Sequence, residues 1–454
     1  MQKLLKRIHE FRDPLHDFIQ LDRQERMLVD SPLFQRLRHI HQLALTYLVY
    51  PGGSHKRFEH SLGVMHLAGK VFDIITEPAN LHPDIEYLIP DRKNLPYWRT
   101  VLCLAALCHD MGHLPFSHAA EKDLLPKHQD HESLTLSSIG SEYLQDVWKT
   151  GFWVHAEHVK KLAVGRKKYR GPEEFSDWEA ILSEIIVGDA FGVDRIDYLL
   201  RDSYHLGVSY GKFDHLKLIS SLRILPQSSE PDDSREPSLG IEEGGIHSAE
   251  ALLLARYFMY EQVYFHSARR IYDIHLIEFM KAHYGPSGYE PNIEFHLSQT
   301  DNEVLSAMRL AAKDPSAIGH RAALAILKRG HFRRVYSRNP ADEALLNKSI
   351  EGGAIELEPN TPLSPGYYIH SRAVQEFGKE SLRYDPYLQS SNPNQFPVLL
   401  HDRRIEESTQ VSSVIAKIPL TVTDFIFAEP KIAGDVASWI ERRREEILRG
   451  TRLL

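Results

Sequence analysis

The sequence lacks several features that mark secreted, membrane-bound and disulfide-stabilised proteins. It contains only two cysteines, Cys103 and Cys108, which share one apolar run and are expected to be small core side chains rather than a disulfide. No run approaches the roughly 18 apolar residues of a membrane span, and the basic N-terminal residues are not followed by the apolar region of a signal peptide. We therefore expect a cytoplasmic protein with no membrane partner.

An excess of positive charge is also missing. Lysine and arginine number 54 against 62 aspartates and glutamates, so the net charge is -8 with histidine neutral. Because affinity for nucleic acids rests on clustered lysines and arginines, a nucleic-acid partner is not expected. One basic cluster could line a groove, although such a run more often forms a solvated loop: Arg166, Lys167, Lys168 and Arg170. A local basic pocket for a small phosphorylated ligand stays open.

Apolar residues recur at helical spacing over most of the first 285 residues. Helices are expected after the N-cap Ser31, from about Phe58 to Phe72, from Trp98 to His109, from Trp178 to His205, and from His247 to about His283. Two short strands are expected within Leu222 to Glu243, with an exposed loop at Pro226 to Asp233 between them.

The pattern loosens after Gly285, where a strand-like run at Ile415 to Phe427 precedes an amphipathic helix at Asp435 to Leu448. The fold class is therefore expected to be mostly α, with a helical core over residues 1–285 and a smaller α+β region over residues 286–454.

The segment His109 to His118 concentrates imidazoles and a carboxylate directly behind the apolar run that ends at Cys108. Neutral imidazole and carboxylate are ligands that suit first-row divalent ions. The chain has two more His-Asp pairs, at His16 and His401, but the first lies in a turn-like segment and the third beside two arginines. Only the pair at His109 ends a helix with a buried pattern and continues into more histidines.

A single ion needs about four to six ligands, so residues from other helices must complete such a site. His109 and Asp110 lie about 100° apart on a helix, and both reach one ion only if the helix ends or bends there. Gly112 is expected to supply that break. The candidates for the distant ligands are His60 and Asp194.

Four segments, in this order, resemble the HD-domain phosphohydrolases: Arg57 to Val64, His109 to His118, His131-Glu132, and Val193 to Asp202. The resemblance covers roughly residues 8–285 and is greatest to the deoxynucleoside triphosphate triphosphohydrolases, including the type with a SAM domain, although no SAM-like domain is expected before this core. It implies an HD-domain helical core and one divalent metal ion, which could be Mn, Mg, Fe, Co, Ni or Zn. The implied metal ligands are His60, His109, Asp110 and Asp194; taken singly, a histidine on an apolar helix face is more often a buried core residue than a ligand.

The resemblance also implies catalytic residues, because a leaving alkoxide needs a proton donor and imidazole is suited to that role. His118 and His131 are the candidate donors, with His113 close to the phosphate. Glu121 stands where the resembled enzymes have an aspartate that orients the second histidine. The carboxylate is kept, but it reaches one methylene further.

Substrate contacts implied by the resemblance fall into three sets. Arginines would face the triphosphate, other side chains would face the sugar, and two tyrosines would face the base. These residues are Arg57, Arg195 and Arg256; Gln42, Leu43, Tyr198 and Asp202; and Tyr260 and Tyr264. Tyr260 and Phe265 depart from the His and Gln of the mammalian base pocket, which leaves the preferred base open.

A second, regulatory nucleotide site is implied by Asp30, Gln35 and Arg38, which preserve a guanine-binding pattern of the family. The alternative is that Asp30 caps a helix and the other two are exposed helix residues. A homo-oligomer is expected, since the regulatory site of the family lies between subunits.

The expected function is metal-dependent hydrolysis of deoxynucleoside triphosphates to deoxynucleoside and triphosphate, with possible activation by a nucleotide. One alternative is a phosphohydrolase of nucleoside monophosphates or cyclic nucleotides. Another is a nucleotide-binding regulator with weak catalysis.

Overall fold

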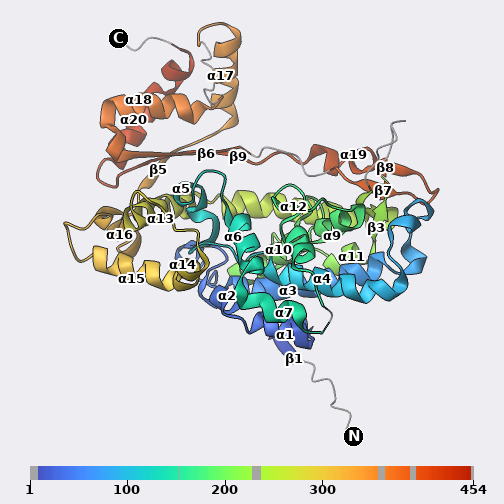
Figure 1. Ribbon diagram of the computed structural model, residues 1–454. Helices are drawn as coiled ribbons and strands as arrows, with labels where there is room; N and C mark the ends of the chain where they lie inside the picture. The colour runs from blue at the N-terminus through green and yellow to red at the C-terminus, as the bar shows by residue number, and fades with distance from the viewer. Residues whose placement is uncertain (1–8, 152, 227–236, 356–362, 389–394, 451–454) are drawn as a thin grey trace. The chain divides into compact units, whose positions relative to one another are not determined.

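The computed structural model describes residues 9–151, 153–226, 237–355, 363–388 and 395–450. Helices dominate these ranges, and small sheets occur mainly towards the C-terminal part of the chain (Figure 1), which confirms the mostly α fold class. Within the described residues, none of the helices combines the length and the apolar character that crossing a bilayer requires.

Two compact units share the chain, and each is assembled from three stretches. The first unit comprises residues 1–259, 284–306 and 393–418, and the second comprises residues 260–283, 307–392 and 419–454. The sequence-based division at residue 285 stays a prediction.

The first unit is built mainly of helices. They are α1 (Arg23–Val29), α2 (Pro32–Arg36), α3 (Arg57–Ile75), α4 (Leu95–Cys108), α5 (Glu121–Leu124), α6 (His131–Gly140), α7 (Gln145–Lys149), α8 (Ala156–Val164), α9 (Asp177–Val187), α10 (Val193–Leu206), α11 (His215–Ser220), α12 (Ile246–Met259), α14 (Ile293–Ser298) and α19 (Ser408–Val411). Helix α3 packs against both α4 and α10, so residues far apart in the sequence meet in one core.

The strands of the first unit form two small sheets. They are β1 (His9–Asp13), β2 (Asp17–Leu21), β3 (Leu222–Leu225), β4 (Ser238–Glu242), β7 (Pro397–Leu399) and β8 (Ile405–Glu407). Strands β1 and β2 form an antiparallel hairpin, and the second sheet has the order β3-β4-β7-β8, in which only β4 and β7 run parallel.

The second unit has a three-stranded antiparallel sheet with the order β5-β9-β6. Its elements are α13 (Ser267–Tyr284, except its last residue), α16 (His320–Leu327), β5 (Arg333–Ser337), α17 (Pro340–Glu351), α18 (Pro365–Phe377), β6 (Leu382–Leu388), β9 (Val422–Ala428) and α20 (Ala433–Leu448); α15 (Asp301–Ala311) contributes residues to both units. Helices α18 and α20 pack on each other and on this sheet, where Ile369, Ile426 and Val436 are fully buried.

Several expected helices are confirmed, and for one of them the structure also confirms the predicted cap at its start. The Ser31 side chain caps α2 by accepting a hydrogen bond from the Phe34 backbone amide, with proline at the first helical position. The helices expected near residues 58–72 and 98–109 are α3 and α4, and the C-terminal helix is α20. The two strands expected within residues 222–243 are β3 and β4, whereas residues 227–236 of the loop between them lie outside the described residues.

The expectation of one long helix from Trp178 to His205 is wrong. Helix α9 ends at Val187 and α10 begins at Val193, with a glycine at each side of the turn between them. A Cβ atom on Gly192 would lie 2.7 Å from the backbone oxygens of Gly188 and Ile186, so the turn is too tight for a side chain there. The apolar period is helical on both sides of this turn, which is why the pattern alone missed it.

Two further expectations need correction. The helix expected over residues 247–283 is interrupted by a π-helical turn, Tyr260–Tyr264, between α12 and α13. The strand-like run from Ile415 to Phe427 is a strand only from Val422, because Ile415–Lys417 forms a 3-10 turn. Pro419, which has no backbone N–H to donate to a sheet, lies between the two.

Candidate active site

The four residues predicted to bind a metal come together from three places in the first unit. His60 lies on α3, His109 and Asp110 follow the end of α4, and Asp194 lies in the first turn of α10. One ligand atom each of His60, His109 and Asp194 lies within 4.8 Å of the others. Asp110 adjoins them, with Oδ1 3.4 Å from His109 Nε2 and Oδ2 3.6 Å from His60 Nε2. We call these four residues the metal group.

The orientation of His109 suits a cation. Its Nδ1 donates a hydrogen bond to the Ala106 carbonyl oxygen at 2.8 Å, so Nε2 carries a lone pair. That buried Nε2 has no hydrogen-bond partner among the described residues, and it lies 3.6 Å from Asp194 Oδ1. A buried, unpartnered ring nitrogen beside carboxylates is the arrangement that a divalent ion would satisfy. The residues therefore fit the ion that the family resemblance implies.

His60 is held by carboxylates on both sides of its ring. Its Nε2 lies 3.0 Å from Asp194 Oδ1, and its Nδ1 lies 2.8 Å from Asp197 Oδ2. Burial by itself would lower the pKa of His60, but the hydrogen bonds to Asp194 and Asp197 outweigh it and raise the pKa to about 10. Without an ion, this ring is therefore held by carboxylates that would otherwise repel one another.

The residues that lie behind His60 have no role predicted from the sequence. Asp197 is fully buried, and besides His60 it contacts His16 Nε2 at 2.7 Å and Arg201 Nε at 2.8 Å. Arg201 in turn pairs with Asp13 at 2.9 Å. The signal in the sequence was an aspartate and an arginine four residues apart in a helix whose neighbouring positions are apolar. His16 lies in the turn that the sequence predicts, and this turn places its ring in the interior.

Two glycines allow the close approaches that build the site. A Cβ atom on Gly63 would lie 2.0 Å from Asp197 Oδ1, and one on Gly112 would lie 2.0 Å from the His131 backbone oxygen. The expectation that Gly112 breaks the helix is wrong, because α4 already ends at Cys108. Gly112 instead lets the start of α6 lie against the turn that carries the metal group.

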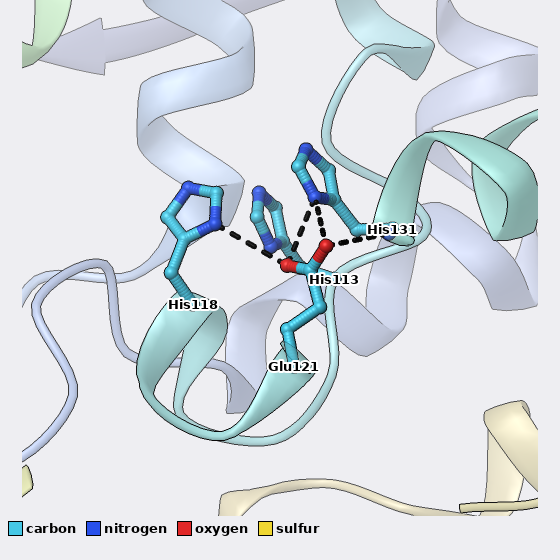
Figure 2. A group of neighbouring side chains, drawn as sticks. All are labelled: His113, His118, Glu121 and His131. Atoms are coloured by element: carbon cyan, nitrogen blue, oxygen red, sulfur yellow. Dashed lines mark hydrogen bonds and ion pairs between the residues drawn. The ribbon is translucent and has the colours of Figure 1, made fainter. Parts of the chain in front are cut away.

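The four predicted catalytic residues also converge, and we call His113, His118, Glu121 and His131 the histidine group. Figure 2 shows the Glu121 carboxylate between the rings of His118 and His131. It accepts from His131 Nδ1 at 2.9 and 3.0 Å and from the His131 backbone amide at 3.0 Å, and it lies 3.3 Å from His118 Nδ1. The longer glutamate therefore still reaches His131.

The electrostatics distinguish the histidines of this group. Burial would lower the pKa of His131, but the hydrogen bond to Glu121 and the charge of that residue raise it overall. Burial and the positive charge of Arg57 lower the pKa of His113. His113 Nε2 lies 3.2 Å from Asp110 Oδ1, which links the two groups, whereas the His118 side chain is 66% exposed.

One of the predicted phosphate-binding arginines, Arg57, contacts the metal group directly. Arg57 is buried, donates to Ser117 Oγ at 2.7 Å and pairs with Asp110 through a second nitrogen. Burial would raise the pKa of Asp110, but the Arg57 charge and nearby histidines hold it well below its usual range. Arg195 is half-buried, follows Asp194 on α10 and donates to the Gly188 carbonyl oxygen at 3.3 Å. Arg256 lies on α12.

Two of the predicted sugar-binding residues, Gln42 and Asp202, meet at His55, for which the sequence predicted no role. Asp202 Oδ1 lies 2.7 Å from His55 Nε2, and the Gln42 backbone amide donates to the His55 carbonyl oxygen at 3.1 Å. Leu43 is buried next to Gln42, and Tyr198 lies one helical turn before Asp202. The predicted base-contacting tyrosines, Tyr260 and Tyr264, lie together in the π-helical turn with ring centroids 5.3 Å apart.

The three predicted regulatory residues lie at α1 and α2 and have local contacts. Asp30 follows the end of α1 and accepts from Arg26 Nε at 2.7 Å. Gln35 donates to the Val29 carbonyl oxygen at 2.7 Å and accepts from Arg38 Nε at 2.8 Å. The Arg38 guanidinium lies 3.5 Å from the centroid of the Phe58 ring. Their regulatory role stays a prediction.

Comparison with family models identifies two matching regions in the chain. The model of the HD domain matches residues 57–182, and the model of the HD associated region matches residues 213–342. The first match contains His60, the His-Asp pair at His109 and the whole histidine group.

Curated relatives match over part of their length. An uncharacterized protein of Methanocaldococcus jannaschii is 36% identical over 58% of this chain and 47% of its own length, and the uncharacterized protein YwfO of Bacillus subtilis is 33% identical over 60% and 54%. The deoxynucleoside triphosphate triphosphohydrolase SAMHD1 of Gallus gallus is 31% identical over 60% and 45%. The chain thus spans about half the length of the curated relatives it matches.

Solved structures match over nearly the whole chain. A hypothetical protein from Aquifex aeolicus is 30% identical, with a TM-score of 0.75 over 95% of this chain and 99% of the other. A structure described as a phosphohydrolase from Bacteroides thetaiotaomicron is 21% identical, with a TM-score of 0.66 over 93% and 99%, and it shows a shared fold.

Proposed function

We propose that this chain, which belongs to the HD-domain family, is a metal-dependent phosphohydrolase that acts on nucleoside triphosphates. The observation that carries the proposal is the position of His109 Nε2. It is buried and unpartnered among the described residues, and it faces Asp194 beside a group of histidines suited to proton transfer.

The metal group provides two imidazoles and two carboxylates. His60, His109, Asp110 and Asp194 would hold the ion, which, when bound, supplies an activated water and polarises a phosphoryl oxygen. Asp197 orients His60 from behind through Nδ1, which leaves Nε2 directed at Asp194. Arg57 places positive charge beside the group, and Arg195, the residue after Asp194, would add a second charge for a triphosphate.

The histidine group supplies the proton for the leaving oxygen. Glu121 fixes the ring of His131 by accepting at Nδ1, so the other ring nitrogen is available to face the substrate. His118 is the second candidate donor, because its ring is exposed and its Nδ1 also faces Glu121. His113 is the member of this group that contacts Asp110, and from there it would contact the phosphate.

The finer proposal is that the substrate is a deoxynucleoside triphosphate, cleaved at the α-phosphorus to deoxynucleoside and triphosphate. Tyr198 and Asp202 lie four residues apart on α10 and so share one face of that helix, next to Gln42. In this arrangement Asp202 would accept from the sugar 3′-hydroxyl and Tyr198 would pack against C2′, which excludes a ribose by its size. The similarity to SAMHD1 of Gallus gallus, a deoxynucleoside triphosphate triphosphohydrolase by name, supports this choice.

Product analysis tests both levels of the proposal. The purified protein is incubated with each dNTP and NTP, singly and mixed, with Mn²⁺ or Mg²⁺, and the products are separated by HPLC. Deoxynucleoside plus triphosphate is expected, and Asp110→Ala should abolish it. Release of nucleoside monophosphate and pyrophosphate, or of nucleoside diphosphate and phosphate, would rule out cleavage of the bond between the α-phosphorus and the nucleoside oxygen. The protein would still be a phosphohydrolase.

Nucleotide activation and assembly form a separate proposal. Asp30, Gln35 and Arg38 would bind a guanine nucleotide that promotes a homo-oligomer. If so, Asp30→Ala removes activation by added guanine nucleotide but leaves the unstimulated rate unchanged. Activation that persists in Asp30→Ala rules out this use of the residue.

A further inference from the structure

A third group of potential metal ligands lies outside the residues assigned to the proposed function. His155 is the residue before the first turn of α8, His158 lies three residues later, and Glu173 lies in the segment between α8 and α9. One ligand atom of each lies within 4.8 Å of the others. We call these three residues the surface group, because His155 is exposed, the Glu173 side chain is 39% exposed and His158 is half-buried.

The residue types and their spacing match a zinc site with an open position. Two histidines three apart at the start of a helix present their rings on the same side, and here the ring centroids are 5.2 Å apart. Two imidazoles and one glutamate, with water as the fourth ligand, form a known tetrahedral zinc set. Softer and harder ions fit this set less well, since it contains no thiolate and only one carboxylate.

Neighbouring aromatic residues hold His158 in position. The Tyr97 hydroxyl lies 2.8 Å from His158 Nδ1 and also accepts from the His155 backbone amide at 3.3 Å. When Nδ1 donates to this hydroxyl, Nε2 keeps its lone pair for an ion. The indole of Trp98 stacks on the same imidazole with centroids 4.9 Å apart, which limits rotation of the ring.

The local charge also favours a cation. Glu173 and Glu179 share one lysine, Lys161, whose Nζ lies 3.4 Å from the first carboxylate and 3.1 Å from the second. Lys161 is itself buried and donates to the Glu174 carbonyl oxygen at 2.6 Å. With both histidines neutral, two carboxylates and one ammonium leave one negative charge beside the imidazoles.

We propose that the surface group binds a Zn²⁺ ion that fastens residues 166–176 to the start of α8. The same segment is anchored at its other end, where Lys168 Nζ lies 2.7 Å from Asp130 and 3.2 Å from Glu132. These two residues flank His131 of the histidine group. The ion would therefore restrict a segment that already contacts the beginning of α6, and its site is separate from the metal group.

Metal counting on the full chain without a histidine tag tests the proposal. Wild type and the variants His155→Ala and Glu173→Gln are dialysed against Zn²⁺ alone, and the bound metal is measured by atomic emission. Each variant should bind one equivalent fewer than wild type. His128→Ala, which changes an exposed histidine outside the metal, histidine and surface groups, should bind as wild type does. Equal binding by wild type, His155→Ala and Glu173→Gln would overturn the proposal.

Two further measurements separate this site from the metal group. Asp194→Asn should lose the ion of the metal group and, after loading with Co²⁺, keep the absorption bands of the tetrahedral surface site. Glu173→Gln should lose those bands. Tyr97→Phe removes only the partner of His158 and should weaken Zn²⁺ binding at this site by about 10- to 100-fold. If Tyr97→Phe binds with wild-type affinity, Tyr97 does not orient a ligand and the proposed geometry is wrong.

Limited trypsin digestion reports on the segment itself. Its cleavage sites include Arg166, Lys167, Lys168 and Arg170. Zn²⁺ should slow cleavage there in wild type and in Asp194→Asn, but not in Glu173→Gln. Protection that persists in Glu173→Gln would show that the ion acts elsewhere. Because these readouts require no substrate, they stand or fall independently of the proposed activity.

Discussion

The metal group and the surface group contain the same kinds of ligand but differ in what surrounds them. His60 and His109 are buried, and a network of Asp197, His16 and Arg201 lies behind His60. The surface group has an exposed histidine and a glutamate whose side chain is 39% exposed, and Tyr97 is its main support. Burial and a supporting network fix the positions of donors before an ion arrives, and that is what catalysis requires. An exposed group can bind an ion and order a segment, but it holds its donors less firmly.

The largest effect is expected for His109→Ala, which removes the unpartnered nitrogen of the metal group. Activity should fall by more than about 1,000-fold, equivalent to at least about 4 kcal/mol of transition-state stabilisation. Metal content should fall by one equivalent. The matched control is His401→Ala, in an exposed His-Asp pair elsewhere in the chain. Comparable losses in both variants would mean that the distinction between the two His-Asp pairs is wrong.

A smaller but still large effect is expected for Glu121→Gln. The carboxylate raises the pKa of His131, so its removal lowers that pKa and leaves less of the proton donor charged at neutral pH. The turnover number should fall by about 100-fold or more, and the alkaline fall in its pH profile should move to lower pH. Glu121→Asp keeps the charge and should retain more activity. If the pH profile of Glu121→Gln is the same as that of wild type, His131 is not the proton donor.

Asp197→Asn tests the network behind His60. Metal affinity should weaken by about 10- to 100-fold, because the amide orients the imidazole less strongly than the carboxylate does. Stability should drop by about 3 kcal/mol, the lower end for a broken buried ion pair, since Asp13 still pairs with Arg201. Denaturant unfolding and metal titration measure the two effects separately. Wild-type affinity in a folded Asp197→Asn protein would argue that the network serves stability alone.

The smallest effect on activity is expected for His155→Ala. This variant should retain activity within about twofold, because the surface group lies outside the proposed catalytic residues. At zinc concentrations about 100-fold above the dissociation constant, wild type should gain about 2.7 kcal/mol of stability from this site, and the variant should lack that part of the gain. Thermal unfolding with and without zinc provides the comparison. A large activity loss in His155→Ala would couple the two sites and contradict their proposed separation.

The sequence-based predictions are correct where they depend on neighbouring residues in the chain and fail where they depend on packing between distant residues. Ser31 and Pro32 mark the start of α2 because capping depends on residues within one turn. The break between α9 and α10 was missed because the helical period continues across it, and only the packing of Gly188 and Gly192 decides the turn. The role assigned to Gly112 was wrong for a related reason. Gly112 needs to lack a side chain because the His131 backbone, in a different helix, lies against it, and not because its own helix ends there.

The sequence by itself determined the family, the mostly helical class and the residue types of the site. Short motifs carry that information, because a metal ion or a proton transfer needs particular side chains whatever surrounds them. Only the tertiary structure decided which of these side chains meet. His16 and Asp197 support His60, and His55 joins Gln42 to Asp202, through contacts between segments about 100 or more residues apart in most cases. Such contacts depend on how α3, α4 and α10 pack, and no local pattern encodes the distance between two helices that meet only after folding.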